Sequence, residues 1–366
     1  MNRRPAKSIT LTDVAARCGL SRMAVSYALR GNRKFVSEAT IKRVAAAARK
    51  LGYDPGQAHA ARRLRYHGSD VRVVNHVVAL FFPLNGVQER YSALILQGLH
   101  AGFAGDEYGM LMYDCQPGRG AIDEQLPILF RRGDVDGAVV FATEQYRTEL
   151  IGSLRRLPGF AERPVVTLTE AFPGCTAVVV DDFAVGRLAT GHLLDLGHRH
   201  LTTFKAKRYN SPITLTRIRG QRQAFEERGL DPDQGLHILP WLWDEGSNLE
   251  EAMAAALQSH PKVTGILAPN DGTGIPLTRA LGRLGYRIPQ DFSIIGVDDC
   301  GEWPGAEETN QWSSVRIPLF ELGRQAAQCL VRQIRREEVP ELVVMPVELV
   351  VRGSTGAPRL KGKAAT

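Results

Sequence analysis

Four side chains near the start of the chain have the chemistry needed to read DNA bases. Arg22, Met23, Ser26 and Tyr27 fall within six residues, and their spacing predicts one outward face of a short helix. Arginine can donate two hydrogen bonds to the O6 and N7 atoms of guanine, and methionine or tyrosine can contact a thymine methyl group or a phosphate. The set therefore predicts a helix that reads base pairs in the major groove.

A second group of polar side chains comes directly after apolar segments later in the chain. Asn270 and Asp271 end one such segment, and Asp298 and Asp299 end another. In parallel sheets, ligands bind at the carboxyl ends of the strands, so these residues are candidates for a small-molecule site. Asp271 and Asp299 are as well suited to cap the helices that follow.

The sequence contains none of the catalytic patterns G-x-S-x-G, H-E-x-x-H or Walker A, and no G-x-G-x-x-G in a strand-to-helix context. His192, His198 and His200 are close in sequence, but they span a helix end, a turn and the next strand, which disfavours a metal site. The adjacent aspartates at 181–182 and 298–299 diverge in a strand or loop and make poor acid–base partners. We therefore expect no enzyme, no metal and no cofactor.

Composition indicates a protein of the cytoplasm. The longest apolar run, from Val77 to Leu84, is interrupted by Pro83 and is too short to span a membrane. The first residues lack the apolar core of a signal peptide. The five cysteines are scattered without C-x-x-C spacing, which suits a reducing compartment.

Charge is distributed unevenly along the chain. Residues 1–68 carry fifteen Lys and Arg against three acidic residues, a formal charge of +12, whereas the remainder carries −5. A small basic segment attached to a mildly acidic body indicates a polyanionic partner for that segment alone. The segment is rich in helix signals, which argues against a merely solubilising tail.

Three helices are predicted in this basic segment. Apolar residues repeat at helical spacing over 11–18, 24–29 and 41–51, and each run follows a capping residue, namely Thr10, Ser21 and Ser37. Gly19 can end the first helix in a left-handed conformation. Two short helices joined by a tight turn and braced by a third form a helix-turn-helix unit.

From residue 71 onward, strands alternate with helices, which is typical of parallel sheets with helical crossovers. Two such series follow one another and resemble the two-domain fold of periplasmic sugar-binding proteins. The expected strands lie at 73–82, 110–114, 136–142, 163–169, 176–182, 200–206, 237–243, 263–271 and 292–299. The predicted fold is an all-α helix-turn-helix headpiece followed by an α/β periplasmic-binding-protein-like body of two Rossmann-like subdomains.

Residues 9–53 resemble the DNA-binding headpiece of the LacI/GalR family of bacterial transcriptional regulators. The pattern D-V-A…G-L-S…V-S-x-x-L and the closing L-G-Y-x-P carry the resemblance, which continues to the end of the chain. It implies base readers at Arg22, Met23 and Tyr27, and phosphate contacts at Ser21, Ser26 and Thr40.

The hinge departs from the family pattern. After Pro55 the family has a helix that orders on DNA and wedges a leucine into the minor groove. That leucine usually stands seven residues after the proline, where this chain has Arg62, and the only nearby leucine is Leu64. Either the hinge helix is shifted by two residues, or Arg62 and Arg63 enter the minor groove electrostatically. A flexible basic linker is the remaining alternative.

For the body, the resemblance implies that Arg217 and Asp298 contact a small effector. Arginine and a carboxylate together suit hydroxyl-rich or carboxylate-bearing molecules, most often sugars. Asn270 is a further candidate contact. Trp241 or Trp243 could stack on a sugar ring or simply pack between domains.

One expected acid is missing from this site. Thr169 stands where the family most often has an aspartate, and Glu170 follows it. This departure leaves open a DNA-binding regulator without a small effector. A pure solute-binding protein is a further alternative, which the missing signal peptide and the basic segment disfavour.

The sequence thus predicts a homodimeric repressor that binds a palindromic operator. The C-terminus lacks leucine heptads, so we expect no tetramerising coiled coil. The expected divisions are a headpiece at 1–54, a hinge at 55–70, an N-terminal subdomain at 71–174 plus 316–340, a C-terminal subdomain at 175–315 plus 341–357, and a basic tail at 358–366.

Overall fold

The computed structural model describes residues 10–29, 32, 35–51, 53, 74–83, 90–115, 128–142, 144–205, 211–240, 248–300 and 311–359. The chain divides into two compact units, Met1–Val74, here called the head, and Asn75–Thr366, here called the body. Among the described residues, no helix combines the length and the apolar character needed to cross a membrane.

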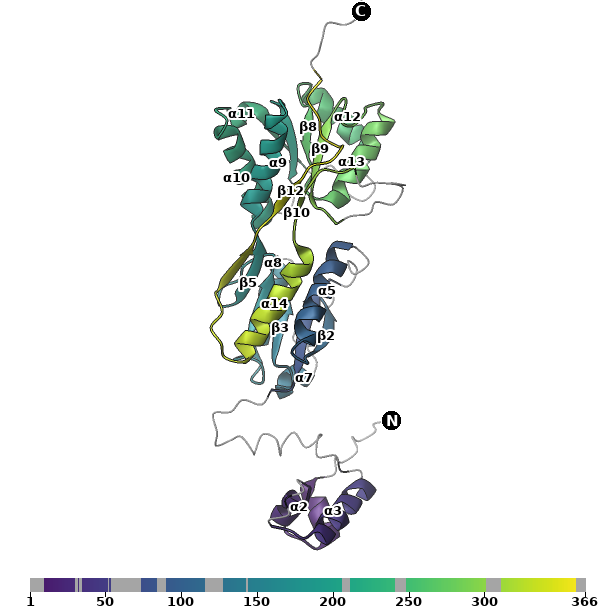
Figure 1. Ribbon diagram of the computed structural model, residues 1–366, viewed down its shortest axis with the longest axis vertical. Helices are drawn as coiled ribbons and strands as arrows, with labels where there is room; N and C mark the ends of the chain where they lie inside the picture. Colours follow the sequence, from purple (N-terminus) through teal and green to yellow (C-terminus); the bar gives the residue numbers. More distant parts are fainter. Residues whose placement is uncertain are drawn as a thin grey trace, which may run out of the picture. The chain divides into compact units, whose positions relative to one another are not determined.

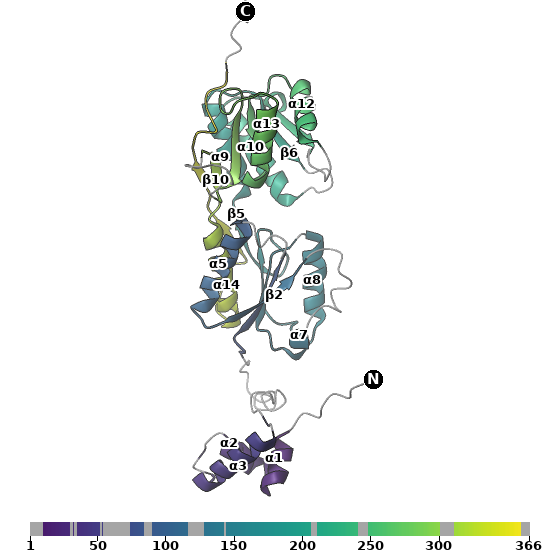
Figure 2. The same cartoon turned by 90° about the vertical axis from the view of Figure 1, so that its right-hand side faces the viewer.

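The described residues of the head form three helices around a small core, and Figure 2 shows how these helices pack together. They are α1 (Leu11–Cys18), α2 (Arg22–Leu29) and α3 (Glu38–Leu51). Each helix contributes residues to the core, which consists of Val14, Ala15, Val25, Ala28, Val44, Ala48 and Tyr53. The predicted helix-turn-helix unit is confirmed.

Local capping explains where these helices begin and end. Thr10 and Asp13 form a capping box at the start of α1, and Gly19 ends the helix with φ 61°. The Ser21 hydroxyl accepts a hydrogen bond from the Ala24 backbone N–H at 3.2 Å at the start of α2. The Ser37 hydroxyl does the same for the Thr40 N–H at 3.3 Å in α3.

The first sheet of the body has six parallel strands. In spatial order they are β11 (Leu342–Met345), β5 (Thr176–Val180), β4 (Val165–Leu168), β3 (Gly137–Val140), β1 (Val77–Phe82) and β2 (Gly109–Asp114). Alternate residues of β1 point to opposite faces. Leu80 packs in the core with α5 (Arg90–Ala104) and α14 (Leu319–Ile334), and Phe81 packs in the core with α7 (Ile128–Arg132) and α8 (Glu144–Arg156) (Figure 2).

The second sheet also has six strands, all parallel except for the antiparallel pairing of β12 with β10. In spatial order they are β12 (Glu348–Val350), β10 (Ser314–Arg316), β9 (Ser293–Asp298), β8 (Gly265–Leu267), β6 (Leu201–Lys205) and β7 (Leu236–Pro240). The associated helices are α9 (Asp182–Asp195), α10 (Pro212–Glu226), α11 (Pro232–Gly235), α12 (Leu249–Ser259) and α13 (Asp271–Arg283) (Figure 1). Helices α9 and α10 share a core with Ile295, whereas α12 and α13 share one with Ile294 on the opposite face.

Three described segments carry the chain between the two sheets: from β5 into α9, from β10 into α14, and from β11 into β12 (Figure 1). The sequence led us to place 175–180 and 341–345 in the C-terminal subdomain, yet β5 and β11 belong to the first sheet. They pair with each other in parallel, Ala177 opposite Leu342, so both lie at one edge of that sheet. Alternation of strands and helices reveals that a strand exists but not which sheet it joins.

Candidate functional site

The predicted reading face of α2 points away from the core of the head. Val25 and Ala28 are buried and hold the helix in place, while Arg22 is exposed and Met23 is 66% exposed. Ser26 and Tyr27 are partly buried at the edge of that face. The helix therefore presents the side chains that the sequence singled out.

Two of the three side chains expected to contact phosphates, Ser21 and Thr40, lie at helix N-termini, whereas Ser26 lies within α2. Ser21 caps α2, and the Thr40 hydroxyl lies 2.9 Å from that of Ser37, the residue that caps α3. Helix N-termini present free backbone N–H groups and attract anions. Ser21 and Thr40 therefore lie at helix ends that can attract an anion, and their contacts with phosphates stay predictions.

Five predicted contacts lie outside the described residues: Arg62, Arg63, Leu64, Trp241 and Trp243. Their roles in the hinge and in ligand stacking stay predictions.

In the body, Arg217 is fixed by two contacts within its own subdomain. Its Nε donates to Asp182 Oδ1 at 2.7 Å, and its Nη1 donates to the Pro269 carbonyl oxygen at 2.7 Å. Asp182 begins α9, which Asp181 caps by accepting the Ala184 N–H at 2.9 Å. Among the described residues, no other acceptor takes a hydrogen bond from the Arg217 guanidinium group.

Two glycines bring α9 and α10 close enough for the ion pair between Arg217 and Asp182 to form. A Cβ atom on Gly186 would lie 2.0 Å from the Arg217 carbonyl oxygen, and one on Gly220 would lie 2.0 Å from the Phe183 carbonyl oxygen. Only glycine permits such an approach. Sequence reasoning missed Asp182, because nothing in the local pattern shows that these two helices cross at glycine.

Asp298 provides an uncommitted carboxylate at the end of β9. The residue is 8% exposed, its backbone has φ 106°, and no described residue donates a hydrogen bond to its carboxylate. Burial raises the pKa of Asp298 well above its usual value, although Arg217 opposes the shift. Burial likewise raises the pKa of Asp182 against the effect of Arg217. A buried carboxylate of this kind is stabilised by a ligand that donates hydrogen bonds.

Tyr91 brings the other subdomain into the site. It stands at the start of α5, and burial raises the pKa of its hydroxyl, as do the nearby charges of Asp298 and Asp182. The phenol therefore stays protonated and can donate or accept a hydrogen bond. Its ring lies 6.3 Å from that of Phe141, which follows β3. No sequence signal marks Tyr91, since its proximity to Asp298 comes from tertiary structure.

Thr169 and Glu170, which stand where the family most often has an aspartate, both make contacts within the protein. Thr169 has φ 67°, and its hydroxyl donates to the Leu168 carbonyl oxygen at 2.6 Å. The Glu170 carboxylate forms a partly buried ion pair with Arg147 of α8. Glu170 is therefore neutralised within the protein.

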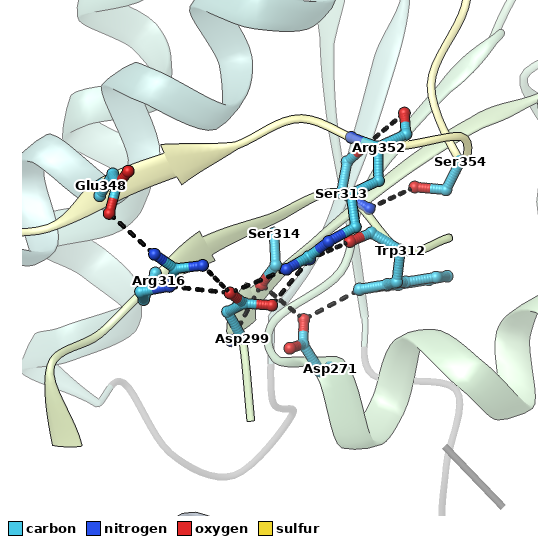
Figure 3. A network of polar contacts seen from close by, with 9 residues as sticks. All are labelled: Asp271, Asp299, Trp312, Ser313, Ser314, Arg316, Glu348, Arg352 and Ser354. Carbon is cyan, nitrogen blue, oxygen red and sulfur yellow. Dashed lines mark hydrogen bonds and ion pairs between the residues drawn. The ribbon is translucent and has the colours of Figure 1, made fainter. Parts of the chain in front are cut away.

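Asn270, expected as a ligand contact, caps α13: its Oδ1 accepts the Thr273 N–H at 2.9 Å. Its neighbour Asp271 is 5% exposed and accepts hydrogen bonds from Trp312 Nε1 at 2.9 Å and Ser314 Oγ at 2.8 Å (Figure 3). Burial raises the pKa of Asp271 to about 6, and these two hydrogen bonds limit the rise. Both side chains therefore bond to neighbouring parts of the protein at the ends of these strands.

Asp299 joins the end of β9 to the strands that lead to the other subdomain (Figure 3). Arg352 donates to both of its carboxylate oxygens, at 2.7 and 3.1 Å, and Arg316 of β10 donates to Oδ2 at 2.9 Å. Arg316 also donates to Glu348 of β12 at 3.0 Å. Burial would raise the pKa of Asp299, but these arginines outweigh it and lower that pKa.

The three histidines that are close in sequence separate in the fold. His192 bonds to Thr355 at 2.9 Å, His198 bonds to Thr264 at 2.8 Å, and His200 stacks on His237. Within the described ranges, no three His, Cys, Asp or Glu side chains are placed to hold a metal ion.

Comparison with known proteins identifies the family. Residues 10–56 match the model of bacterial regulatory proteins of the lacI family, and residues 190–355 match a periplasmic binding protein-like domain. The HTH-type transcriptional regulator CelR of Thermobifida fusca is 30% identical over 355 residues, covering 94% of this chain and 98% of CelR. The chain belongs to the LacI family. It is therefore a DNA-binding transcriptional regulator, as the sequence predicted.

Other LacI-family relatives agree. The ribose operon repressor of Escherichia coli K12 is 26% identical over 350 residues, covering 94% of this chain and 99% of the repressor. A structure of CelR with cellobiose covers 94% of this chain and 99% of its own, with 26% identity and a TM-score of 0.61. A ribose-bound regulator from Enterococcus faecium covers 77% of this chain and 100% of its own, with 26% identity and a TM-score of 0.62. The predicted fold is thereby confirmed.

Proposed function

We propose that this LacI-family chain is a cytoplasmic repressor that binds a palindromic operator as a homodimer and is controlled by an uncharged sugar. The head supplies α2 as the reading helix, and a dimer places two such helices in successive major grooves. Free cysteines at all five positions suit a reducing compartment. The absence of catalytic sequence patterns supports a regulator without enzymatic activity.

The observation that carries the effector proposal is the proximity of Arg217, which bonds to Asp182, to the Asp298 carboxylate, to which no described residue donates a hydrogen bond. A fixed guanidinium edge and a carboxylate acceptor suit the hydroxyl groups of a sugar, and Tyr91 adds a hydroxyl from the opposite subdomain. CelR with cellobiose and the ribose-bound regulator supply precedents within the family.

The charge balance favours a neutral sugar over a sugar acid. Asp182 already neutralises Arg217, and Glu170 neutralises Arg147, so the charge of Asp298 is left over. Above the raised pKa of Asp298, where its carboxyl group is ionised, a ligand carboxylate about 5 Å away would be repelled by about 3 kcal/mol at an effective dielectric constant of about 20. That energy corresponds to a loss of affinity of about 100-fold.

A sugar bound between Tyr91 and Asp298 would bias the relative orientation of the two subdomains. By linkage, that bias changes operator affinity by the same factor by which the operator changes sugar affinity. Couplings of this kind are typically about 1–3 kcal/mol.

Thermal denaturation of the full-length protein tests the effector. D-cellobiose, D-ribose, D-glucose and D-gluconate are compared on the wild-type chain, on Arg217→Ala and on Arg222→Ala, whose arginine lies on the same helix but pairs with Asp233 at the surface. We expect a neutral sugar to raise the Tm of the wild-type chain and of Arg222→Ala but not of Arg217→Ala. An equal response of Arg217→Ala would place the sugar elsewhere, and no response to any sugar would favour a regulator without a small effector.

Selection from random DNA duplexes tests the other half of the proposal. Enrichment of palindromes with two half-sites supports a dimeric repressor. Salt-sensitive binding without enrichment would show that the head binds DNA without reading it.

A further inference from the structure

An aromatic side chain that the sequence did not single out stacks on the reading helix. The ring of Phe35 lies 4.5 Å from that of Tyr27, centroid to centroid, with 20° between their planes. Two described residues between α2 and α3 are linked to the reading helix: the Asn32 N–H donates to the Tyr27 carbonyl oxygen at 3.0 Å, and the Phe35 N–H donates to the Asn32 carbonyl oxygen at 3.3 Å. Phe35 is therefore held beside Tyr27 by backbone and ring contacts alike.

Phe35 is also far more exposed than a phenylalanine that serves only to pack. It is 62% exposed, and only Met23, at 66%, exceeds it among the large hydrophobic side chains of the described residues. Met23 precedes Tyr27 by one turn of α2, so it lies on the same face. Isolated exposed apolar residues are ordinary, but here the two most exposed ones flank one proposed base reader in the most basic part of the chain.

We propose that Phe35 is a positioning residue of the DNA-reading surface: its ring fixes that of Tyr27, and its outer face is covered by the major groove of the operator. This inference rests on the proposed operator binding and extends it to a residue outside the reading helix. Fixing the Tyr27 ring before binding removes rotamer freedom that would otherwise be lost on the DNA.

Because Phe35 carries no charge, its effect differs from that of a phosphate contact. Phosphate contacts change affinity for all sequences together and change the salt dependence of binding. A side chain that orients a base reader changes affinity for the correct sequence only. The loss of Phe35 should therefore appear as relaxed preference at one base pair in each half-site.

The experiment measures binding of the full-length chain to the duplex that the wild-type protein enriches, and to a scrambled duplex of the same length. The variants are Phe35→Ala, Phe35→Tyr, Tyr27→Ala and the double variant Phe35→Ala/Tyr27→Ala. Ile128→Ala is the matched control, since Ile128 is 56% exposed and lies in the body. Thermal denaturation of each variant reports on folding.

We expect Phe35→Ala to weaken operator binding about tenfold, which corresponds to the upper end of the energies measured for aromatic pairs. Binding to the scrambled duplex and the Tm should stay unchanged. Phe35→Tyr should restore binding, and the double variant should bind as weakly as Tyr27→Ala alone. The proposal would be overturned if the affinity losses of the two single variants added up in the double variant, or if Phe35→Ala lost as much affinity for scrambled DNA as for the operator. It would also be overturned if Phe35→Ala bound the operator as tightly as the wild-type chain. If the wild-type chain enriches no operator, operator reading itself fails, and the role of Phe35 fails with it.

Discussion

Replacing Asp271 by asparagine should change how the stability of the body depends on pH. The carboxylate is 5% exposed, and both of its side-chain donors, Trp312 Nε1 and Ser314 Oγ, bond to the same oxygen, Oδ1. Asparagine keeps that oxygen and the shape of the side chain but cannot ionise. The substitution therefore removes the buried charge while preserving both hydrogen bonds.

The expected size follows from the pKa of Asp271, which burial raises from 3.8 to about 6. That difference corresponds to about 3 kcal/mol. Because the pKa is raised in the folded state, the folded protein binds more protons between these two values. The free energy of unfolding of the wild-type chain therefore falls as pH rises from 4 to above 6, and the Asp271→Asn variant lacks this loss.

Urea unfolding at a series of pH values between 4 and 8 measures the effect. We expect Asp271→Asn to gain about 2.5 kcal/mol relative to the wild-type chain between pH 4 and pH 7.5, since the other carboxylates are common to both proteins and part of the full difference already lies below pH 4. Asp195→Asn is the control, because a hydrogen bond from Arg228 lowers the pKa of Asp195 and reverses the expected sign. A difference that stays constant over this range, or a loss for Asp271→Asn at high pH, would show that the hydrogen bonds outweigh burial.

Three further substitutions test other parts of the argument. Gly296→Ala should lower the free energy of unfolding by about 3 kcal/mol in urea denaturation, since its Cβ would lie 2.0 Å from Asp271 Oδ1. Ser21→Ala should cost about 1 kcal/mol of head stability, measured by the loss of helical circular dichroism on heating, because the Ala24 N–H loses its cap. Asp298→Asn should raise the free energy of unfolding at pH 8, where the buried carboxylate is most costly, and this gain should fade as pH falls through the raised pKa of Asp298. The same substitution should weaken sugar binding in the thermal shift assay. A stability at pH 8 equal to that of the wild-type chain would contradict the unpaired state of Asp298.

The head was predictable from sequence because its signals are local. The capping box at Thr10, the left-handed Gly19 and the cap at Ser21 all act within four residues of their own position. Periodic apolar residues then determine which face of each helix is buried, and so which face of α2 is exposed. Phe35 escaped prediction because its partner Tyr27 is eight positions earlier, across a connection whose path the pattern does not reveal.

The body was predictable in its elements but only partly in its site. Arg217 could be named as a candidate from the family resemblance, and Asp298 from that resemblance and from its position at the end of a strand. Asp182 and Tyr91 could not, since the first depends on the glycine-mediated crossing of α9 and α10 and the second on the meeting of two subdomains. Contacts of this kind join residues that are far apart in sequence.

The adjacent residues Asp298 and Asp299 have different roles: Asp298 is the proposed ligand contact, and Asp299 holds the end of its strand in place. The protein surrounds Asp299 with Arg352 and Arg316, which lower its pKa, and leaves Asp298 buried without a described donor, which raises its pKa. Arg316 then reaches Glu348 on the strand that leads to the other subdomain. A ligand that engages Asp298 therefore acts on a strand end that is anchored, through its next residue, to two of the segments linking the subdomains. This arrangement would transmit the proposed sugar binding into the proposed subdomain reorientation, because the anchored end cannot relax independently of those segments.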